Sequence, residues 1–155
     1  MQKERGRAAM GKPFGGVVLN TAFRVIVPFT IVYGIYVLTH GEFSPGGGFQ
    51  AGALLAIGIV LARLVQGQDA KFNIKGTHAV MLAGVGAFIY AATGFLPLFF
   101  GGNFLEYGCL PVHMHEAAEL HALGILMIEI GVTLTVMMTI TDIMDALVRE
   151  SDSDE

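Results

Sequence analysis

Long apolar stretches separated by short polar connections dominate the chain. A helix that spans a membrane needs about 20 mostly apolar residues, and four stretches are long enough. They run from about Thr21 to Thr39, Phe49 to Val65, Thr77 to Leu98 and Glu119 to Leu147. The last is the longest, so we expect it to project past the membrane on one side. The pattern predicts an all-α integral membrane protein with four transmembrane helices.

Composition argues against a soluble protein with buried helices. Of the 155 residues, 54% are hydrophobic and only 14% are charged, whereas soluble domains average about 25% charged residues. The single cysteine, Cys109, excludes an internal disulfide framework and a Cys-based metal site. A net charge of −4 does not suggest a nucleic-acid partner.

The basic residues predict the orientation. All nine Lys and Arg residues fall on one side of a four-span arrangement. Because cytoplasmic loops carry the excess of Lys and Arg, we expect both termini in the cytoplasm. Residues 1–20 would form a basic cytoplasmic segment, 21–148 the four-helix membrane domain, and 149–155 an acidic, disordered tail.

Small residues recur at four-residue spacing in two of the predicted helices. The series are Gly48, Gly52 and Ala56, and Ala83, Ala87 and Ala91. Such spacing lets helices approach closely in lipid. It predicts packing among the four helices and against other subunits.

A glycine-rich turn joins the first two predicted helices. Locally it is explained as a tight turn, since Gly permits positive φ. Glycines at a helix start also leave N–H groups exposed, which could hold a neighbouring chain or an anion. No Walker A lysine or preceding strand accompanies them. We predict a turn and docking motif made of Ser44, Pro45, Gly46, Gly47, Gly48 and Phe49.

Glu129 lies within an apolar stretch of the last predicted helix, near its centre. Charged side chains at that depth are costly, so the carboxyl group should face a partner or a hydrated cavity. One interpretation is a neutral, hydrogen-bonded Glu that fixes helix packing. The favoured one is an ion or proton pathway, because intramembrane acids usually mark such routes.

Polar residues precede Glu129 at the start of the same helix. His115 and Glu119 are four residues apart, so one helix face could present both. With His113 they make a metal site conceivable, but the HExxH pattern is not met and no second cluster completes a ligand set. We instead predict that Glu119 and His121 shape the outer access to Glu129. Ten residues separate the two Glu, about 15 Å of helix rise, so they cannot touch.

Two charged residues lie near the predicted cytoplasmic ends of helices. Asp142 is in the last helix and Arg24 starts the first. Arg24 would either reach the interface or pair with Asp142 on the same face. We take Arg24 and Asp142 as a candidate inner-face pair, and expect Lys71 and Lys75 to meet lipid headgroups.

The sequence resembles the MnhB/MrpB family, whose members are small membrane subunits of multisubunit Mrp-type Na+/H+ antiporters. Three stretches carry the resemblance: HGEFSPGGGFQAG at 40–52, ATGFLPLFFGG at 92–102 and ELHALGILMIEIGVT at 119–133. It extends from about Thr21 to Asp142. At Glu129 the family commonly has Asp, so the acid is retained with a longer reach. The family's loop before the last helix usually contains fewer histidines than residues 113–115 here, so the resemblance assigns no role to His113 and His115.

The resemblance implies a small subunit in a prokaryotic cell membrane, without catalysis or a cofactor of its own. Its partners would be the large proton-pumping subunits and other small membrane subunits of the antiporter. The same module occurs in membrane-bound hydrogenases and related respiratory complexes, where a redox arm drives ion transport, so hydrogenase-like partners are the alternative. Less favoured are a stand-alone channel and a metal-dependent membrane enzyme.

Overall fold

The computed structural model describes residues 16–41, 46–66, 74, 76–111 and 117–153. It contains four long helices: α2 (Gly16–Thr39), α3 (Gly47–Gln66), α4 (Gly76–Phe95) and α5 (Ala117–Ser153). Each is long and apolar enough to cross a membrane. The described residues contain no strand. The predicted all-helical, four-span architecture is confirmed.

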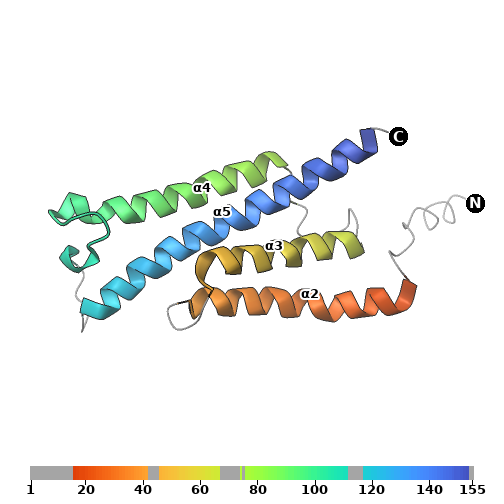
Figure 1. Cartoon of the computed structure of the whole chain (residues 1–155), viewed down its shortest axis with the longest axis horizontal. Helices are drawn as coiled ribbons and strands as arrows, with labels where there is room; N and C mark the ends of the chain where they lie inside the picture. Colours follow the sequence, from red (N-terminus) through yellow and green to blue (C-terminus); the bar gives the residue numbers. More distant parts are fainter. Residues whose placement is uncertain (1–15, 42–45, 67–73, 75, 112–116, 154–155) are drawn as a thin grey trace, which may run out of the picture.

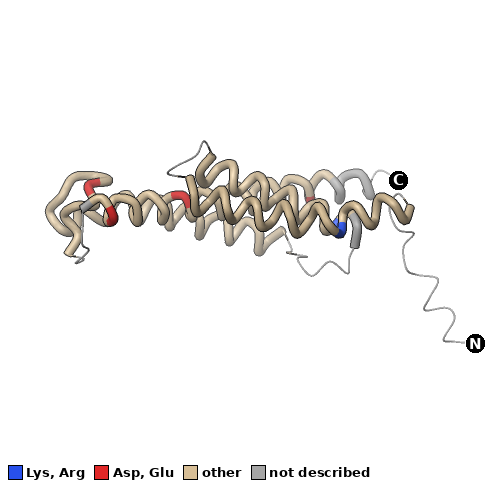
Figure 2. Tube along the Cα trace, turned by 90° about the horizontal axis from the view of Figure 1, so that it is seen from below, with Lys and Arg blue, Asp and Glu red and all other residues tan. Residues whose placement is uncertain are grey.

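The four helices form an open layer in the order α2, α3, α5, α4 (Figure 1). Successive helices α2 and α3 are antiparallel, as are α4 and α5, whereas α3 and α5 run in the same direction. The start of α2 and the end of α5 lie at the same end of the layer, as an even number of spans requires. Seen edge-on, the helices carry few charged positions (Figure 2).

Small side chains allow α3 to sit between its two neighbours. Its buried residues include Ala51, Ala56, Ile59 and Ala62. Against α2, a Cβ on Gly58 would come within 2.9 Å of the Ile31 side chain. Close approach in lipid depends on such small residues, so α3 and α5 can form the centre of the layer.

The α4–α5 contact rests on two facing glycines. A Cβ on Gly86 would lie 2.7 Å from the Gly131 carbonyl oxygen, and one on Gly131 would lie 2.8 Å from the Gly86 carbonyl oxygen. The Thr135 hydroxyl donates to the Ala83 carbonyl at 3.2 Å and to the Gly131 carbonyl at 2.9 Å. The backbones of α4 and α5 are therefore in direct contact here, and the Thr135 hydrogen bond to Ala83 joins the two helices.

Only Ala83 of the predicted alanine series is half-buried, at the seam with α5. Ala87 and Ala91 are exposed, and the buried residues of α4 are Ala79, Gly86 and Gly94. These three lie seven and eight residues apart, which is two helical turns each. Contact with α5 selects this glycine-containing stripe because backbone atoms of α5 leave no room for a methyl group at Gly86.

Two short 3-10 helices, η2 (Leu96–Phe100) and η3 (Tyr107–Cys109), fold back over the end of the α4–α5 pair. The Phe95 and Phe104 rings meet edge to face at 5.3 Å. Beyond them, hydrogen bonds from the Asn103 backbone and side-chain N–H groups lower the pKa of the exposed Glu106 carboxyl. This tip lies past the end of the α2–α3 hairpin (Figure 1).

Helix α5 continues to Ser153, through most of the segment for which the sequence analysis predicts a disordered tail. After Gly131 the chain contains no Gly or Pro, the two residues that most readily end a helix. The helix has no sequence signal to stop earlier, and the disordered acidic tail at 149–155 stays a prediction.

We predict that Gly131→Ala lowers the free energy of unfolding by about 1–3 kcal/mol through overpacking. The added methyl group would meet backbone atoms of Gly86 and Tyr90, both at 2.8 Å, although Ala is the better helix former. Circular-dichroism melting of the chain in detergent measures the change. Gly84→Ala is the matched control, because its Cβ has no atom within 4 Å. Equal melting of both variants would contradict the glycine contact.

Candidate functional site

The α2–α3 connection meets α5 at Glu129. The glycine-rich turn and the acid of the last helix, which the sequence did not link, therefore lie side by side. A Cβ on Gly41 would lie 2.6 Å from Glu129 Oε2, and one on Gly47 would lie 2.9 Å from Oε1. A Cβ on Gly48 would collide with the Glu129 backbone. The carboxyl group thus occupies a space left by the missing side chains of Gly41 and Gly47, and the missing side chain of Gly48 lets the Glu129 backbone approach.

Local chain geometry explains these glycines. Gly47 begins α3 with φ of +66°, a left-handed conformation that other residues adopt only with strain. A Cβ on Gly46 would meet Val37 of α2 at 2.9 Å. This geometry agrees with a tight turn at Gly46–Gly48. Ser44 and Pro45 lie outside the described residues, and the turn and docking motif as a whole stays a prediction.

The electrostatics at the start of α3 favour a negative charge. The first N–H groups of a helix have no partner within the helix and give that end a partial positive charge. Glu129 Oε1 lies beside Gly47, the first residue of α3. Glu129 is half-buried and makes polar contacts of its own. Its carboxylate is therefore stabilised where it stands, despite the apolar sequence around it.

Helices α3 and α5 remain in backbone contact over the turn that follows Gly48 and Glu129. The buried Thr133 hydroxyl donates to the Gly48 carbonyl at 2.9 Å. One helical turn further, a Cβ on Gly52 would lie 2.8 Å from the Thr133 carbonyl oxygen. These contacts fix the position of Glu129 along the helix axis relative to the α2–α3 connection.

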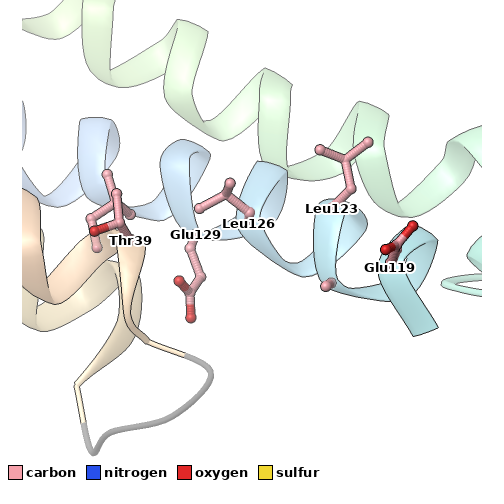
Figure 3. A pocket seen from close by; sticks show the side chains of 7 residues that line it. Thr39, Glu119, Leu123, Leu126 and Glu129 are labelled. Carbon is pink, nitrogen blue, oxygen red and sulfur yellow. The ribbon is translucent and has the colours of Figure 1, made fainter. Parts of the chain in front are cut away.

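A pocket of about 310 Å³ extends from Glu129 along α5. Helix α5 continues past the α2–α3 connection (Figure 1), so its first turns are not covered by that hairpin. Glu129 lies at one end of the pocket beside the connection, and Glu119 lies toward the start of α5 (Figure 3). The lining residues are Leu38, Thr39, Glu119, Ala122, Leu123, Leu126 and Glu129. The pocket is polar at its ends and apolar between them.

The structure places His121 on another face of α5. Its ring packs edge to face against Tyr107 of η3, with centroids 6.3 Å apart, and it does not line the pocket. Glu119 and Glu129 thus line the same pocket, about 15 Å apart along α5, and His121 does not. Residues two apart on a helix point about 200° apart, which explains why Glu119 and His121 diverge.

The ion pair at the opposite end of the layer involves Arg63 of α3 and Asp145 of α5. Arg63 also donates to the Ile74 carbonyl at 3.0 Å, holding the chain just before α4. Among the described residues Arg63, rather than Arg24, is the cation that pairs at this end of α5, and the pairing of Arg24 with Asp142 stays a prediction. The reason is the helix order: α3, rather than α2, lies along this part of α5.

The sequence held a signal for this pair. Arg63 follows Gly48 by 15 residues, and Asp145 follows Glu129 by 16. Gly48 lies beside Glu129, and α3 and α5 run in the same direction. Arg63 and Asp145 therefore lie at the same position along the helix axes, about 24 Å from Gly48 and Glu129. That step needed the α3–α5 pairing, which a single sequence does not supply.

The remaining sequence candidates are the histidines before α5. His113 and His115 lie outside the described residues. Within the part of the chain that the structure does describe, no three His, Cys, Asp or Glu residues are grouped to hold a metal.

These features define a class: a four-span membrane protein in which an intramembrane carboxylate is built into the contact between a glycine turn and the last helix. A family model described as a domain related to the MnhB subunit of Na+/H+ antiporter matches residues 18–142. The chain belongs to the MnhB family.

Curated relatives agree with that assignment. A protein of Staphylococcus haemolyticus (strain JCSC1435) named "Putative antiporter subunit mnhB2" is 34% identical over 131 residues, covering 84% of this chain and 93% of the relative. One of the same name from Staphylococcus aureus (strain MRSA252) is 32% identical over 132 residues, covering 81% and 94%. The resemblance identified from the sequence is confirmed, and family membership makes the chain a membrane antiporter subunit.

We predict that Thr133→Val lowers the free energy of unfolding by about 0.5–2 kcal/mol, the range of hydrogen bonds between helices in membranes. Val keeps the shape but cannot donate to the Gly48 carbonyl. Titration with SDS in mixed micelles measures the loss. Thr21→Val serves as the control, since that exposed hydroxyl bonds only within α2, to Val17. A loss no greater than the control's would show that the α3–α5 hydrogen bond contributes nothing.

Proposed function

We propose that the chain is a non-catalytic membrane subunit of a multisubunit Mrp-type Na+/H+ antiporter, and that Glu129 forms part of its ion pathway. The observation that carries the proposal is the position of the Glu129 carboxylate at the inner end of a pocket that leads toward Glu119. The family assignment and the relatives' names support the antiporter context.

The chemistry of the pocket suits a proton or a small cation. A carboxylate can take up either, and an intramembrane carboxylate facing a cavity is the usual mark of such a route. Glu119 is exposed at the start of α5, where it would concentrate cations at the entrance. The apolar wall formed by Leu123 and Leu126 separates the two acids, so an ion would cross it with water or with groups from another subunit.

The open layer supports a role in assembly. Large apolar side chains are exposed along the helices, and a four-helix layer has no second layer of its own to cover them. Phe49, at the start of α3, is 67% exposed beside the pocket-forming connection. We therefore retain residues Gly46–Phe49 as a proposed docking motif, with other antiporter subunits and lipid as the neighbours.

The basic residues orient this arrangement in the cell membrane. With Lys and Arg on the cytoplasmic side, both termini and the Arg63–Asp145 pair would face the cytoplasm. The pocket would then open on the outer side. Glu129 would lie in the outer half of the bilayer, since about 24 Å of helix separates it from Asp145.

A purely structural role for Glu129 is the second candidate. It is favoured by the carboxylate's place against Gly41 and Gly47 at the start of α3, where its charge would stabilise that helix end. The two roles differ in one measurable respect. Transport needs the carboxyl proton or charge, whereas packing needs mainly the shape and the hydrogen-bonding oxygen.

We predict that Glu129→Gln reduces Na+/H+ exchange by about tenfold or more, the scale at which positioned proton-transfer groups act, while the complex still assembles. Dye-monitored collapse of the pH gradient on Na+ addition, in everted membrane vesicles, measures exchange. Purification in mild detergent measures assembly.

Two further variants sharpen that experiment. Glu129→Asp retains the carboxylate and should keep most of the exchange. Glu106→Gln, in the exposed loop away from the pocket, should leave it unchanged. Full exchange in Glu129→Gln with an intact complex would refute the pathway and leave the packing role.

A further inference from the structure

Four aromatic rings follow one line along α2. Phe29, Tyr33, Tyr36 and His40 stack in succession, with ring centroids 6.2, 6.3 and 4.2 Å apart and neighbouring planes within 22° of parallel. Their spacings of four, three and four residues keep them on one face of the helix. We name this set the α2 aromatic ladder.

The ladder is not used in packing within the chain. Phe29, Tyr33 and Tyr36 are 69%, 46% and 52% exposed. Helix α2 is at the edge of the layer, and its contacts go almost entirely to α3. Its buried residues, Gly34 and Val37, lie on a different face from the ladder. The aromatic face therefore points outward from the layer.

Depth makes Tyr33 unusual, while Tyr36 lies one turn nearer the outer end of α2. A charged pair such as Arg63–Asp145 belongs near the edge of the hydrocarbon, because charge is costly at its centre. Thr39 lines the pocket with Glu129, which places the end of α2 about 24 Å from that pair. Tyr33 is six residues before Thr39, so it lies about 15 Å from the pair, near the middle of a hydrocarbon layer about 30 Å thick.

Tyrosine in a membrane is normally found at the headgroup level, where its hydroxyl is hydrated. The Tyr33 and Tyr36 hydroxyls form no hydrogen bond with any residue that the structure describes. A hydroxyl left without a partner in hydrocarbon is costly. Lipid tails cannot supply a partner, and the neighbouring exposed side chains Val25 and Val32 are apolar, unlike the lining of a water-filled channel.

We propose that the α2 aromatic ladder is the docking surface for a transmembrane helix of another subunit of the same complex, which supplies hydrogen-bonding side chains to Tyr33 and Tyr36. Stacked rings are stiff, so they lose little conformational freedom on contact. The inference rests on the proposed function only in taking the chain to be part of a complex.

The ladder also ends at the proposed pathway. His40 Nδ1 lies 2.9 Å from the Thr39 hydroxyl oxygen, and Thr39 lines the pocket that holds Glu129. A helix seated along the ladder therefore reaches the edge of that pocket. The docked subunit would be the neighbour nearest to Glu129 on the α2 side.

Photo-crosslinking tests the proposal in cells that express the whole complex. The photoreactive amino acid p-benzoylphenylalanine replaces Tyr33 in one variant and Ile35 in the other. Ile35 is 51% exposed and about 200° around the helix, so it is a matched control. We expect irradiation to join position 33 to another subunit of the complex, identified by mass spectrometry, and position 35 not to be joined to that subunit.

A second measurement examines the hydroxyls directly. The double variant Tyr33→Phe, Tyr36→Phe keeps the rings and the exposed area. It should lower recovery of the crosslinked subunit in mild-detergent purification several-fold, up to about tenfold for two membrane hydrogen bonds. Phe29→Leu, which removes no hydroxyl, should lower it less.

Three results would overturn the proposal: adducts at position 33 with lipid alone, adducts with a second copy of this chain, or unchanged recovery in the double Phe variant. None of them bears on Glu129. If the intact complex still purifies and exchanges Na+ for H+, the docking surface is wrong and the proposed function stands.

Discussion

The rest of the structure depends on the backbone contact between α3 and α5. At Gly48 the two helices approach so closely that a methyl group would strike the Glu129 main chain, and the Thr133 hydroxyl bridges the gap. Water-driven burial gives little help between helices in lipid, so close approach and hydrogen bonds of this kind must hold them together. The same contact sets the level of the α2–α3 connection and encloses the Glu129 carboxylate. Packing and candidate chemistry are therefore inseparable at this point.

Much of the architecture follows from the sequence. Apolar length defined the four helices to within a few residues at most ends, because the bilayer imposes that length. Glu129 and the glycine turn were both recognised, since a buried acid and successive glycines each violate what an ordinary transmembrane segment contains. Their contact was not predicted, because it depends on which helices are neighbours. Helix order also explains why Asp145 pairs with Arg63 of α3. The close approach of α5 to Gly86, which depends on backbone geometry, was likewise not readable from the sequence.

The layer also explains why the chain belongs in an assembly. A closed four-helix bundle hides one face of each helix in a common core. Here α3 and α5 each have two main neighbours, and α2 and α4 each have one, with only a minor contact between α2 and α5. Most large apolar side chains therefore face outward. The apolar faces that a closed bundle would bury in its own core are here available for contact with lipid and with other proteins. Family membership as an antiporter subunit agrees with that geometry.

The unequal lengths of the two hairpins have a consequence for the surrounding lipid. The α2–α3 hairpin ends about 24 Å from the Arg63–Asp145 pair, several ångströms short of an average hydrocarbon layer. The α4–α5 pair extends beyond the α2–α3 connection (Figure 1). Hydrophobic mismatch of this sign is relieved by local thinning of the bilayer. Headgroups and their water would then dip toward the α2–α3 connection on one side of the protein only. The membrane itself would shorten the route from bulk water to Glu129.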